Sequence, residues 1–255
     1  MKTRNLLVKL SKLFPKWIAK QNHDFVGLMT GKMPEEVHKI LLCLDMDETI
    51  LEQVKDIHPD VIFTHHPLVF GPKSKVFKSD LRKKELCEAL DALNIPVYSF
   101  HTNFDTGKGG MNDALSRALE LENIYAPIKE PMMRIGTLKE EMEVHEFATY
   151  AKNKLGVSYG LLIHYGKDMI KKVGIIGGGG SRDYPVAMEE GCDIYISGDA
   201  PHHVRRGYVA LKFNYLDLPH EIERIFMPTM KKILLDMDDS LEIIIINHEE
   251  LPEVI

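Results

Sequence analysis

Short apolar runs recur along the whole chain and alternate with longer amphipathic stretches. This alternation is typical of an α/β protein, in which strands form a mainly parallel sheet and helices cover its faces. Ligands bind beyond the carboxyl ends of parallel strands, so the residues that follow each strand are candidates for a functional site. We predict strands at residues 39–44, 61–64, 97–100, 160–164, 172–176, 193–197, 213–216 and 242–247, and helices at 78–93, 111–121, 144–155 and 204–211.

The length of 255 residues suffices for one large α/β domain or for two joined ones. A stretch containing proline at residues 130–133 divides the chain. We predict one α/β half at residues 1–130 and a second at residues 131–255, with a single intertwined domain as the alternative. Residues 1–10 are basic and amphipathic, which predicts a surface helix rather than a secretory signal.

The composition excludes some classes of protein. A formal net charge of -6 weighs against a nucleic-acid-binding surface spread over the whole molecule. No stretch approaches the ~20 apolar residues that a membrane-spanning helix needs. The three cysteines, Cys43, Cys87 and Cys192, form no CxxC motif, which is typical of reduced, buried thiols in a cytoplasmic protein.

Two adjacent histidines, His65 and His66, follow the predicted strand at 61–64 and precede Pro67. Neighbouring strand residues point to opposite faces, so two such side chains reach one cavity only where the strand gives way to a loop. The pair stands at such a point. It predicts metal ligands, with two polar residues that merely end a strand as the alternative.

A second polar loop follows the predicted strand at 97–100 and contains His101 and Asp105. A carboxylate oxygen beside imidazole nitrogens suits zinc, iron or manganese. An Asx-turn or a helix cap is the alternative interpretation of this loop.

A third polar segment follows Asp217 and Pro219 and contains His220 and Glu223. Residues three apart share one face of a helix, so both side chains can reach one ion. A glutamate can also bridge two cations. The alternative is a helix N-terminus whose acidic residues interact favourably with the helix dipole.

Two other strand exits carry weaker signals. Asp199, His202 and His203 follow the predicted strand at 193–197, where they would provide outer contacts to a metal site, substrate contacts or a proton shuttle; capping of the next helix by Asp199 is the alternative. The glycines at 177–180 would offer backbone N–H groups to a phosphate, but the sequence has neither a Walker motif nor a dinucleotide fingerprint there.

A DxDxT sequence at Asp45, Asp47 and Thr49 resembles the first motif of haloacid-dehalogenase-type phosphatases. In that family the first aspartate is a nucleophile and the second a general acid/base. The family gives no role to the histidine motifs, and capping of the next helix by Asp47 is the alternative.

The histidine motifs, in their order and separation, resemble the Nif-three-like dinuclear metal-centre family, whose members are often labelled GTP cyclohydrolase I type 2 homologs. The resemblance covers nearly the whole chain. It is carried by the sequences at 24–28 (DFVGL), 63–70 (FTHHPLVF), 101–105 (HTNFD), 109–113 (GGMND) and 197–199 (SGD).

The resemblance implies a Nif-three-like α/β fold with two similar halves around a metal cleft. It also implies a homo-hexamer, built as a trimer of dimers, with its sites facing an internal cavity. His101 would lie just outside the metal ligands. Two divalent ions would be bound by His65, His66, Asp105, His220 and a bridging glutamate from the C-terminal part of the chain.

The sequence departs from the family at that glutamate. The family places it four residues after the histidine, where this chain has Arg224. We take Glu223 as the bridging ligand, as if one residue were deleted, with Glu221 as the alternative.

The resemblance and the motifs together predict a metal-dependent hydrolase of a small nucleotide or phosphorylated substrate, with two zinc, iron or manganese ions per chain. His101 or His202 would serve as a proton shuttle. The competing hypothesis is a metal-binding scaffold, regulator or metallochaperone without turnover. Nucleic-acid binding is a third hypothesis, which the acidic charge disfavours.

Overall fold

The computed structural model describes residues 1–253 of the chain. They form two compact units: unit 1 contains residues 1–110 and 226–249, and unit 2 contains residues 111–225 and 250–253. Unit 1 is therefore discontinuous in sequence. The division into halves at residue 130 stays a prediction.

Unit 1 is built on a five-stranded sheet. Four of its strands run parallel, and the edge strand β1 is antiparallel to β4. The order across the sheet is β1 (Gly27–Thr30), β4 (Val97–Ser99), β3 (Val61–Thr64), β2 (Lys39–Cys43) and β11 (Glu242–Ile245). The helices of unit 1 are α1 (Thr3–Leu13), α2 (Lys16–Gln21), α3 (Glu48–Ile57), α4 (Lys73–Ser79), α5 (Leu81–Ala92), α6 (Thr102–Thr106) and α11 (Phe226–Met237).

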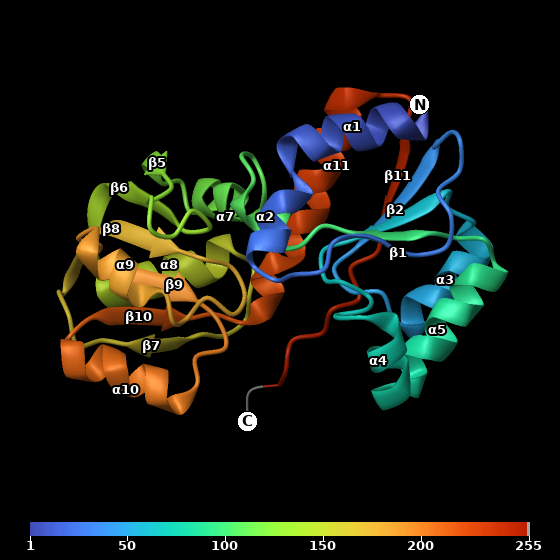
Figure 1. The fold of residues 1–255 in the computed structure, drawn as a ribbon. Coiled ribbons are helices and arrows are strands. Elements are labelled where there is room, and N and C mark those ends of the chain that lie inside the picture. The colour runs from blue at the N-terminus through green and yellow to red at the C-terminus, as the bar shows by residue number, and fades with distance from the viewer. Residues whose placement is uncertain (254–255) are drawn as a thin grey trace. The chain divides into compact units, whose positions relative to one another are not determined.

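Helices cover both faces of this sheet, with α1 and α11 on one side and α3 and α5 on the other (Figure 1). The central strands β3 and β4 are accordingly buried along their whole length, and β2 is buried except at Lys39, as expected for strands covered on both faces. In β3, Ile62 belongs to the core beneath α3 and α5, whereas the ring of Phe63 contacts that of Phe100. The helix predicted at residues 78–93 is divided, because Asp80 ends α4 and caps α5 by accepting a hydrogen bond from the backbone N–H of Lys83.

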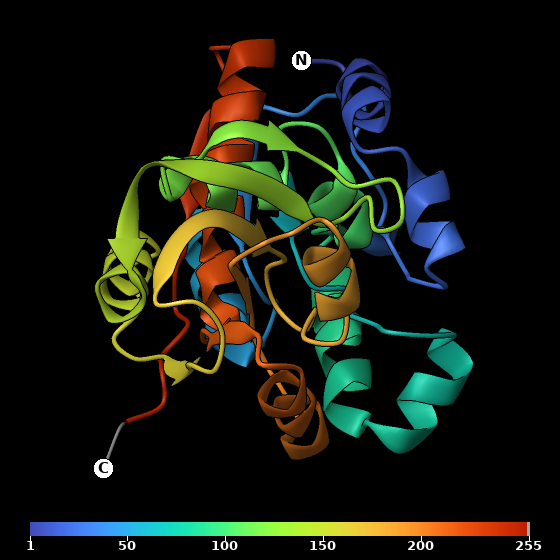
Figure 2. The same ribbon diagram turned by 90° about the vertical axis from the view of Figure 1, so that its left-hand side faces the viewer.

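Unit 2 is built on a six-stranded sheet. Its three central strands β8, β9 and β10 are parallel, but the outer pairings are antiparallel, so the expected mainly parallel arrangement holds only at its centre. The long strand β6 is strongly curved (Figure 2) and its register shifts between Thr137 and Met142. The order is β5 (Glu122–Tyr125), β6 (Arg134–Glu143), β8 (Met169–Ile175), β9 (Ile194–Ser197), β10 (Asn214–Asp217) and β7 (Leu161–Ile163).

The helices of unit 2 are α7 (Met111–Ala118), α8 (Val144–Lys154), α9 (Tyr184–Glu189) and α10 (His202–Leu211), followed by the 3-10 helix η1 (His220–Ile225). Beneath α9 and α10 lies a core with three buried tyrosines, in which the rings of Tyr208 and Tyr215 stack 4.2 Å apart. The α/β class is confirmed, with two sheets flanked by helices. Among the described residues, no helix combines the length and apolarity needed to cross a membrane.

Candidate metal centre

The two adjacent histidines of unit 1 stand where β3 leaves the sheet. The backbone N–H groups of His65 and His66 both donate to the carbonyl oxygen of Leu44, at 3.1 Å each. This shared acceptor means that the strand has ended, so the two imidazoles no longer project to opposite faces. Their ring centroids lie 4.9 Å apart. The loop exit that the sequence predicts is therefore present.

Asp105 lies beside His65 in a largely apolar environment. Its Oδ1 is 3.5 Å from Nε2 of His65, and both side chains are buried. The rings of Phe104 and Phe226 pack around this imidazole, with centroids 6.3 and 5.5 Å away. Burial of an imidazole and a carboxylate among phenylalanines is costly unless their charges and polar atoms are compensated. A divalent cation with nitrogen and oxygen ligands fits this donor set.

His101 completes the imidazole cluster of unit 1. One ring nitrogen from each of His65, His66 and His101 lies within 4.8 Å of the others. Asp24 orients His101, because its Oδ2 lies 2.8 Å from Nδ1 of that ring and also accepts from the hydroxyl of Thr102. Burial alone would raise the pKa of Asp24, but these hydrogen bonds and the nearby imidazole outweigh it and lower the pKa.

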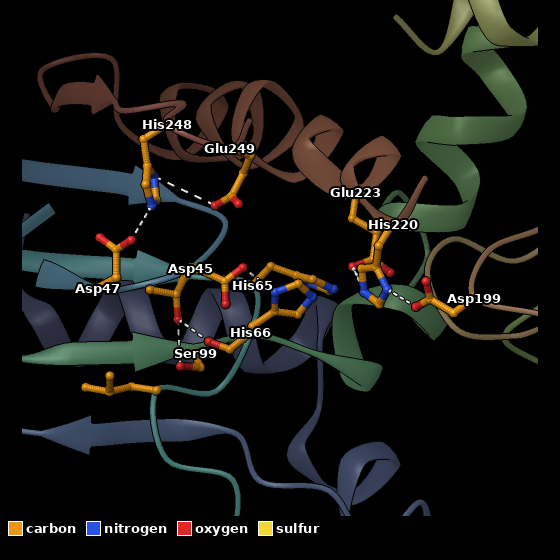
Figure 3. A network of polar contacts seen from close by, with 12 residues as sticks. Asp45, Asp47, His65, His66, Ser99, Asp199, His220, Glu223, His248 and Glu249 are labelled. Atoms are coloured by element: carbon orange, nitrogen blue, oxygen red, sulfur yellow. Dashed lines mark hydrogen bonds and ion pairs between the residues drawn. The ribbon is translucent and has the colours of Figure 1, made fainter. Parts of the chain in front are cut away.

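The DxDxT aspartates have separate structural roles. Asp47 caps α3 by accepting from the backbone N–H of Ile50, which confirms the capping interpretation, and it also contacts His248. Oδ2 of Asp45 lies 2.7 Å from Nδ1 of His66 (Figure 3). Asp45 therefore holds a histidine of the cluster, a role that the phosphatase interpretation did not foresee.

In unit 2, His220 and Glu223 come together on η1. Residues i and i+3 are in line on a 3-10 helix, whereas an α-helix brings both i+3 and i+4 near residue i. Nε2 of His220 lies 3.1 Å from Oε2 of Glu223, and Glu223 is buried. Arg224, at position i+4, instead donates to the carbonyl oxygen of Gly156. Glu221 is only half-buried. Burial of Tyr159, followed by the negative charge of Glu221, raises the pKa of Tyr159.

The glycine run at 177–180 packs against these side chains. A Cβ on Gly178 would lie 2.2 Å from Oε1 of Glu223 and 2.9 Å from Nε2 of His220, and this glycine has φ of +62°. The close approach of the candidate ligands therefore requires glycine at position 178, a structural reason for this residue that needs no phosphate.

Asp199 does not cap α10, so the capping interpretation is wrong. The helix begins after Pro201 without a side-chain cap, and Oδ2 of Asp199 lies 2.6 Å from Nδ1 of His220. Asp199 thus contacts a candidate metal ligand from outside, as one of the sequence interpretations expected. His202 is exposed at the first residue of α10.

Sequence reasoning gave no role to Asp24 and considered Asp45 only as the nucleophile of a phosphatase-like motif, although both residues belong to motifs that were visible. Asp24 opens one of the family-like motifs, and Asp45 follows a buried strand on the same sheet as β3. With Asp199, these residues form a common pattern: an aspartate at Nδ1 of a candidate ligand or neighbouring histidine.

These features define a class: an α/β protein with two helix-flanked sheets whose strand exits gather imidazoles and carboxylates suited to a metal ion. A family model described as Duf34/NIF3 (NGG1p interacting factor 3) matches residues 1–252, and the chain belongs to this family. The predicted family relationship is thereby confirmed.

Related sequences match this chain along nearly its full length. The chain is 31% identical over 244 residues to a GTP cyclohydrolase 1 type 2 homolog of Clostridium perfringens, covering 91% of this chain and 92% of the relative. It is 31% identical to the homolog of Lactococcus lactis, with 95% of each chain covered. A Staphylococcus aureus hypothetical protein has the same fold, with a TM-score of 0.88 at 21% identity, covering 100% of this chain and 99% of that one. Reduced HcgD from Methanocaldococcus jannaschii matches at TM-score 0.79 and 26% identity, with 96% and 97% covered.

Proposed function

We propose that this protein is a dinuclear metal-dependent hydrolase that acts on a small nucleotide or phosphorylated substrate. One observation carries the proposal: His66, His101 and His220 each have Nδ1 within hydrogen-bond distance of an aspartate. A histidine that binds metal typically presents one ring nitrogen to the ion and the other to a carboxylate or carbonyl, which fixes its tautomer and orientation.

The proposed ligands are His65, His66 and Asp105 of unit 1 with His220 and Glu223 of unit 2. Joining the two sets in one centre rests on the family resemblance, whereas the contacts within each unit support the members of each set. Glu223 is preferred to Glu221 as the bridging ligand because its buried carboxylate lies against Nε2 of His220. Mixed nitrogen and oxygen donors favour two zinc, iron or manganese ions.

Two such ions, when bound, stabilise developing negative charge and lower the pKa of water. Side chains of the protein would carry out the proton transfers. His101 is held by Asp24 through Nδ1, so its Nε2 can accept or deliver a proton near the imidazole cluster. His202 is exposed and is the second proposed proton-transfer residue.

The assembly and location of the protein follow as further proposals. The resemblance implies a homo-hexamer built as a trimer of dimers. Three buried free cysteines suit a reducing cytoplasm. The net charge of -6 supports a small-molecule substrate over nucleic acid as the partner.

Metal content per chain, measured by plasma mass spectrometry on protein purified without chelator or affinity metal, tests the ligand set. We expect about two divalent ions in the wild type, fewer in His65→Ala and Glu223→Ala, and the wild-type content in the matched control Glu221→Ala. No metal in the wild type after loading with zinc, manganese or iron would refute the proposal.

A turnover assay distinguishes the hydrolase from the competing hypothesis of a metal-binding protein without turnover. The metal-loaded wild type is assayed for ring opening and for phosphate release on a nucleotide panel, with metal-loaded His65→Ala as the background. Turnover above that background supports a hydrolase. Full metal content with no turnover on any substrate would favour the scaffold, regulator or metallochaperone.

A further inference from the structure

A cavity of about 790 Å³ opens in unit 1 beside the imidazole cluster. Its walls come from α2, the loop after it, β1 and the start of α4. Drug-sized ligands occupy pockets of roughly 300–1,000 Å³, so the volume suits one small organic molecule. The metal ligands are not among its lining residues.

Aromatic side chains give this pocket flat apolar surfaces. Trp17 lines it and is 59% exposed, and Phe25 lines it from the next loop. Phe70, also 59% exposed, contacts Phe25 edge to face with centroids 5.6 Å apart. Large aromatic rings left open to solvent around a concave surface offer stacking partners for a planar ligand.

The same pocket concentrates positive charge on an acidic protein. Lys16, Lys20 and Lys73 line it, although the chain carries a net charge of -6. Lys16 and Lys20 are four residues apart on α2 and share a face. Lys16 is partly buried, and this burial lowers its pKa, so the cationic character of the pocket comes mainly from Lys20 and Lys73. The pocket therefore favours an anionic ligand.

One carboxylate is found among the described lining residues, and it is already engaged. Asp24 accepts hydrogen bonds from the backbone N–H of Phe25 and the hydroxyl of Thr102, and it contacts Nδ1 of His101. Its charge is therefore directed at His101 rather than at the lysines. The ring of Phe70, which contacts that of the lining residue Phe25, also lies 6.3 Å from the ring of His101.

We infer that this pocket binds a nucleotide, with its base stacked on Trp17 and Phe25 and its phosphate held by the lysines. The inference rests on the proposed function, because it makes the pocket the substrate site beside the metal ligands. It adds the place where a base joined to a phosphate would bind and the residues that distinguish a nucleotide from a nucleoside or from phosphate alone.

Trp17 is the single tryptophan of the chain, so its fluorescence reports directly on occupancy. We would titrate GMP, AMP, guanosine and inorganic phosphate separately into the full-length protein. Saturable quenching by the mononucleotides is expected, with weaker binding of guanosine and of phosphate and with affinity that falls as salt rises. The double variant Lys20→Ala/Lys73→Ala should weaken mononucleotide binding about 10-fold or more, since it removes two cations from the phosphate.

The matched control is Lys55→Ala, which removes an exposed lysine of α3 that pairs with Glu52 outside the pocket. Its affinity should equal that of the wild type. Isothermal titration of Trp17→Phe provides a readout independent of fluorescence and should still detect the nucleotide. Absence of quenching and of binding heat at millimolar nucleotide, or equal binding by the lysine double variant, would overturn the inference. So would binding of an oligonucleotide without binding of mononucleotides.

Metal content, quenching and KM, measured on the wild type and on the lysine double variant, separate this inference from the proposed function. Suppose that the wild-type protein contains no metal but nucleotide still quenches Trp17 fluorescence, and that this quenching requires the lysines. The nucleotide pocket is then supported and the hydrolase proposal is refuted. If the wild type holds metal and turns over substrate with a KM that the lysine double variant leaves unchanged, the pocket assignment fails and the hydrolase stands.

Discussion

His220 and Asp199 are joined through Nδ1 of the imidazole and Oδ2 of the carboxylate, 2.6 Å apart (Figure 3). Nε2 of the same ring lies 3.1 Å from Glu223. The ring therefore has an aspartate on one nitrogen and a candidate ligand on the other. The arrangement at Nδ1 recurs twice in unit 1, in the contacts His66–Asp45 and His101–Asp24.

Asp199→Asn should weaken metal binding about 10- to 100-fold, the usual cost of losing an outer carboxylate. Asparagine keeps the shape of the side chain, but its neutral amide no longer raises the basicity of the imidazole. The measurement is zinc affinity by competition with a chromophoric chelator. The fold should be unchanged, as judged by circular dichroism.

A similar pair in unit 2 provides the control for this prediction. Nε2 of His164 lies 3.1 Å from Oδ1 of Asp168, and His164 is not among the candidate ligands. Asp168→Asn should therefore leave zinc affinity at the wild-type value. Equal affinities in all three proteins would show that Asp199 has no part in metal binding.

Gly178→Ala should disturb the candidate ligands directly. Its Cβ would overlap Oε1 of Glu223, and alanine at φ of +62° costs about 1 kcal/mol in backbone strain. Gly191→Ala is the matched control, because φ there is +73° but nothing lies within 4 Å of the new Cβ. Both variants should lose stability in urea, but only Gly178→Ala should also lose metal. Retention of full metal content by Gly178→Ala would contradict the close packing of this loop.

Phe104→Ala should destabilise the protein by about 3–5 kcal/mol, the range for large aromatic truncations in a core. Phe104 is fully buried, and its ring lies 4.7 Å from that of Phe14 and 5.0 Å from that of Phe226. The measurement is urea unfolding. Leu81→Ala, at a residue 64% exposed, should change the free energy of unfolding by less than about 0.5 kcal/mol. A loss below about 1 kcal/mol in Phe104→Ala would mean that the rings do not form a tight core.

Much of the fold could be predicted from the sequence because buried parallel strands are plainly apolar. β2, β3, β9 and β11 lie within or nearly within their predicted ranges. The strands β5 and β6 were missed, since Glu122–Tyr125 is mostly exposed and the second part of β6 is rich in charge. Strands that are exposed or rich in charge lack the apolar signal on which the prediction depends.

The candidate site was less accessible to sequence reasoning. The strand exits identified His65 and His66, because the change from apolar to polar residues is local. The contacts of Asp24 with His101 and of Asp45 with His66 join residues 77 and 21 positions apart, which no local pattern reveals. The spacing of His220 and Glu223 departs from the family, which places the glutamate four residues after the histidine, where this chain has Arg224. The observed 3-10 helix places residues three apart in line.

Asp183→Asn should stabilise the protein at neutral pH but not at acid pH. Burial, followed by the charge of Glu130, raises the pKa of Asp183 from 3.8 to about 6 in the folded protein. Between these values the folded state binds more protons than the unfolded state, so the free energy of unfolding falls as pH rises through this window. Asparagine carries no charge to bury and avoids that loss.

The expected gain from Asp183→Asn is about 1–2 kcal/mol above pH 7, reduced from the full linkage value because the carboxylate is partly solvated, and near zero at pH 4. Urea unfolding at both pH values in the presence of chelator measures it without a contribution from metal binding. The exposed Asp56→Asn serves as the control for the loss of one negative charge and should show no such growth with pH. A gain for Asp183→Asn that is the same at pH 4 and pH 7.5 would mean that this carboxylate titrates alike in the folded and unfolded chains.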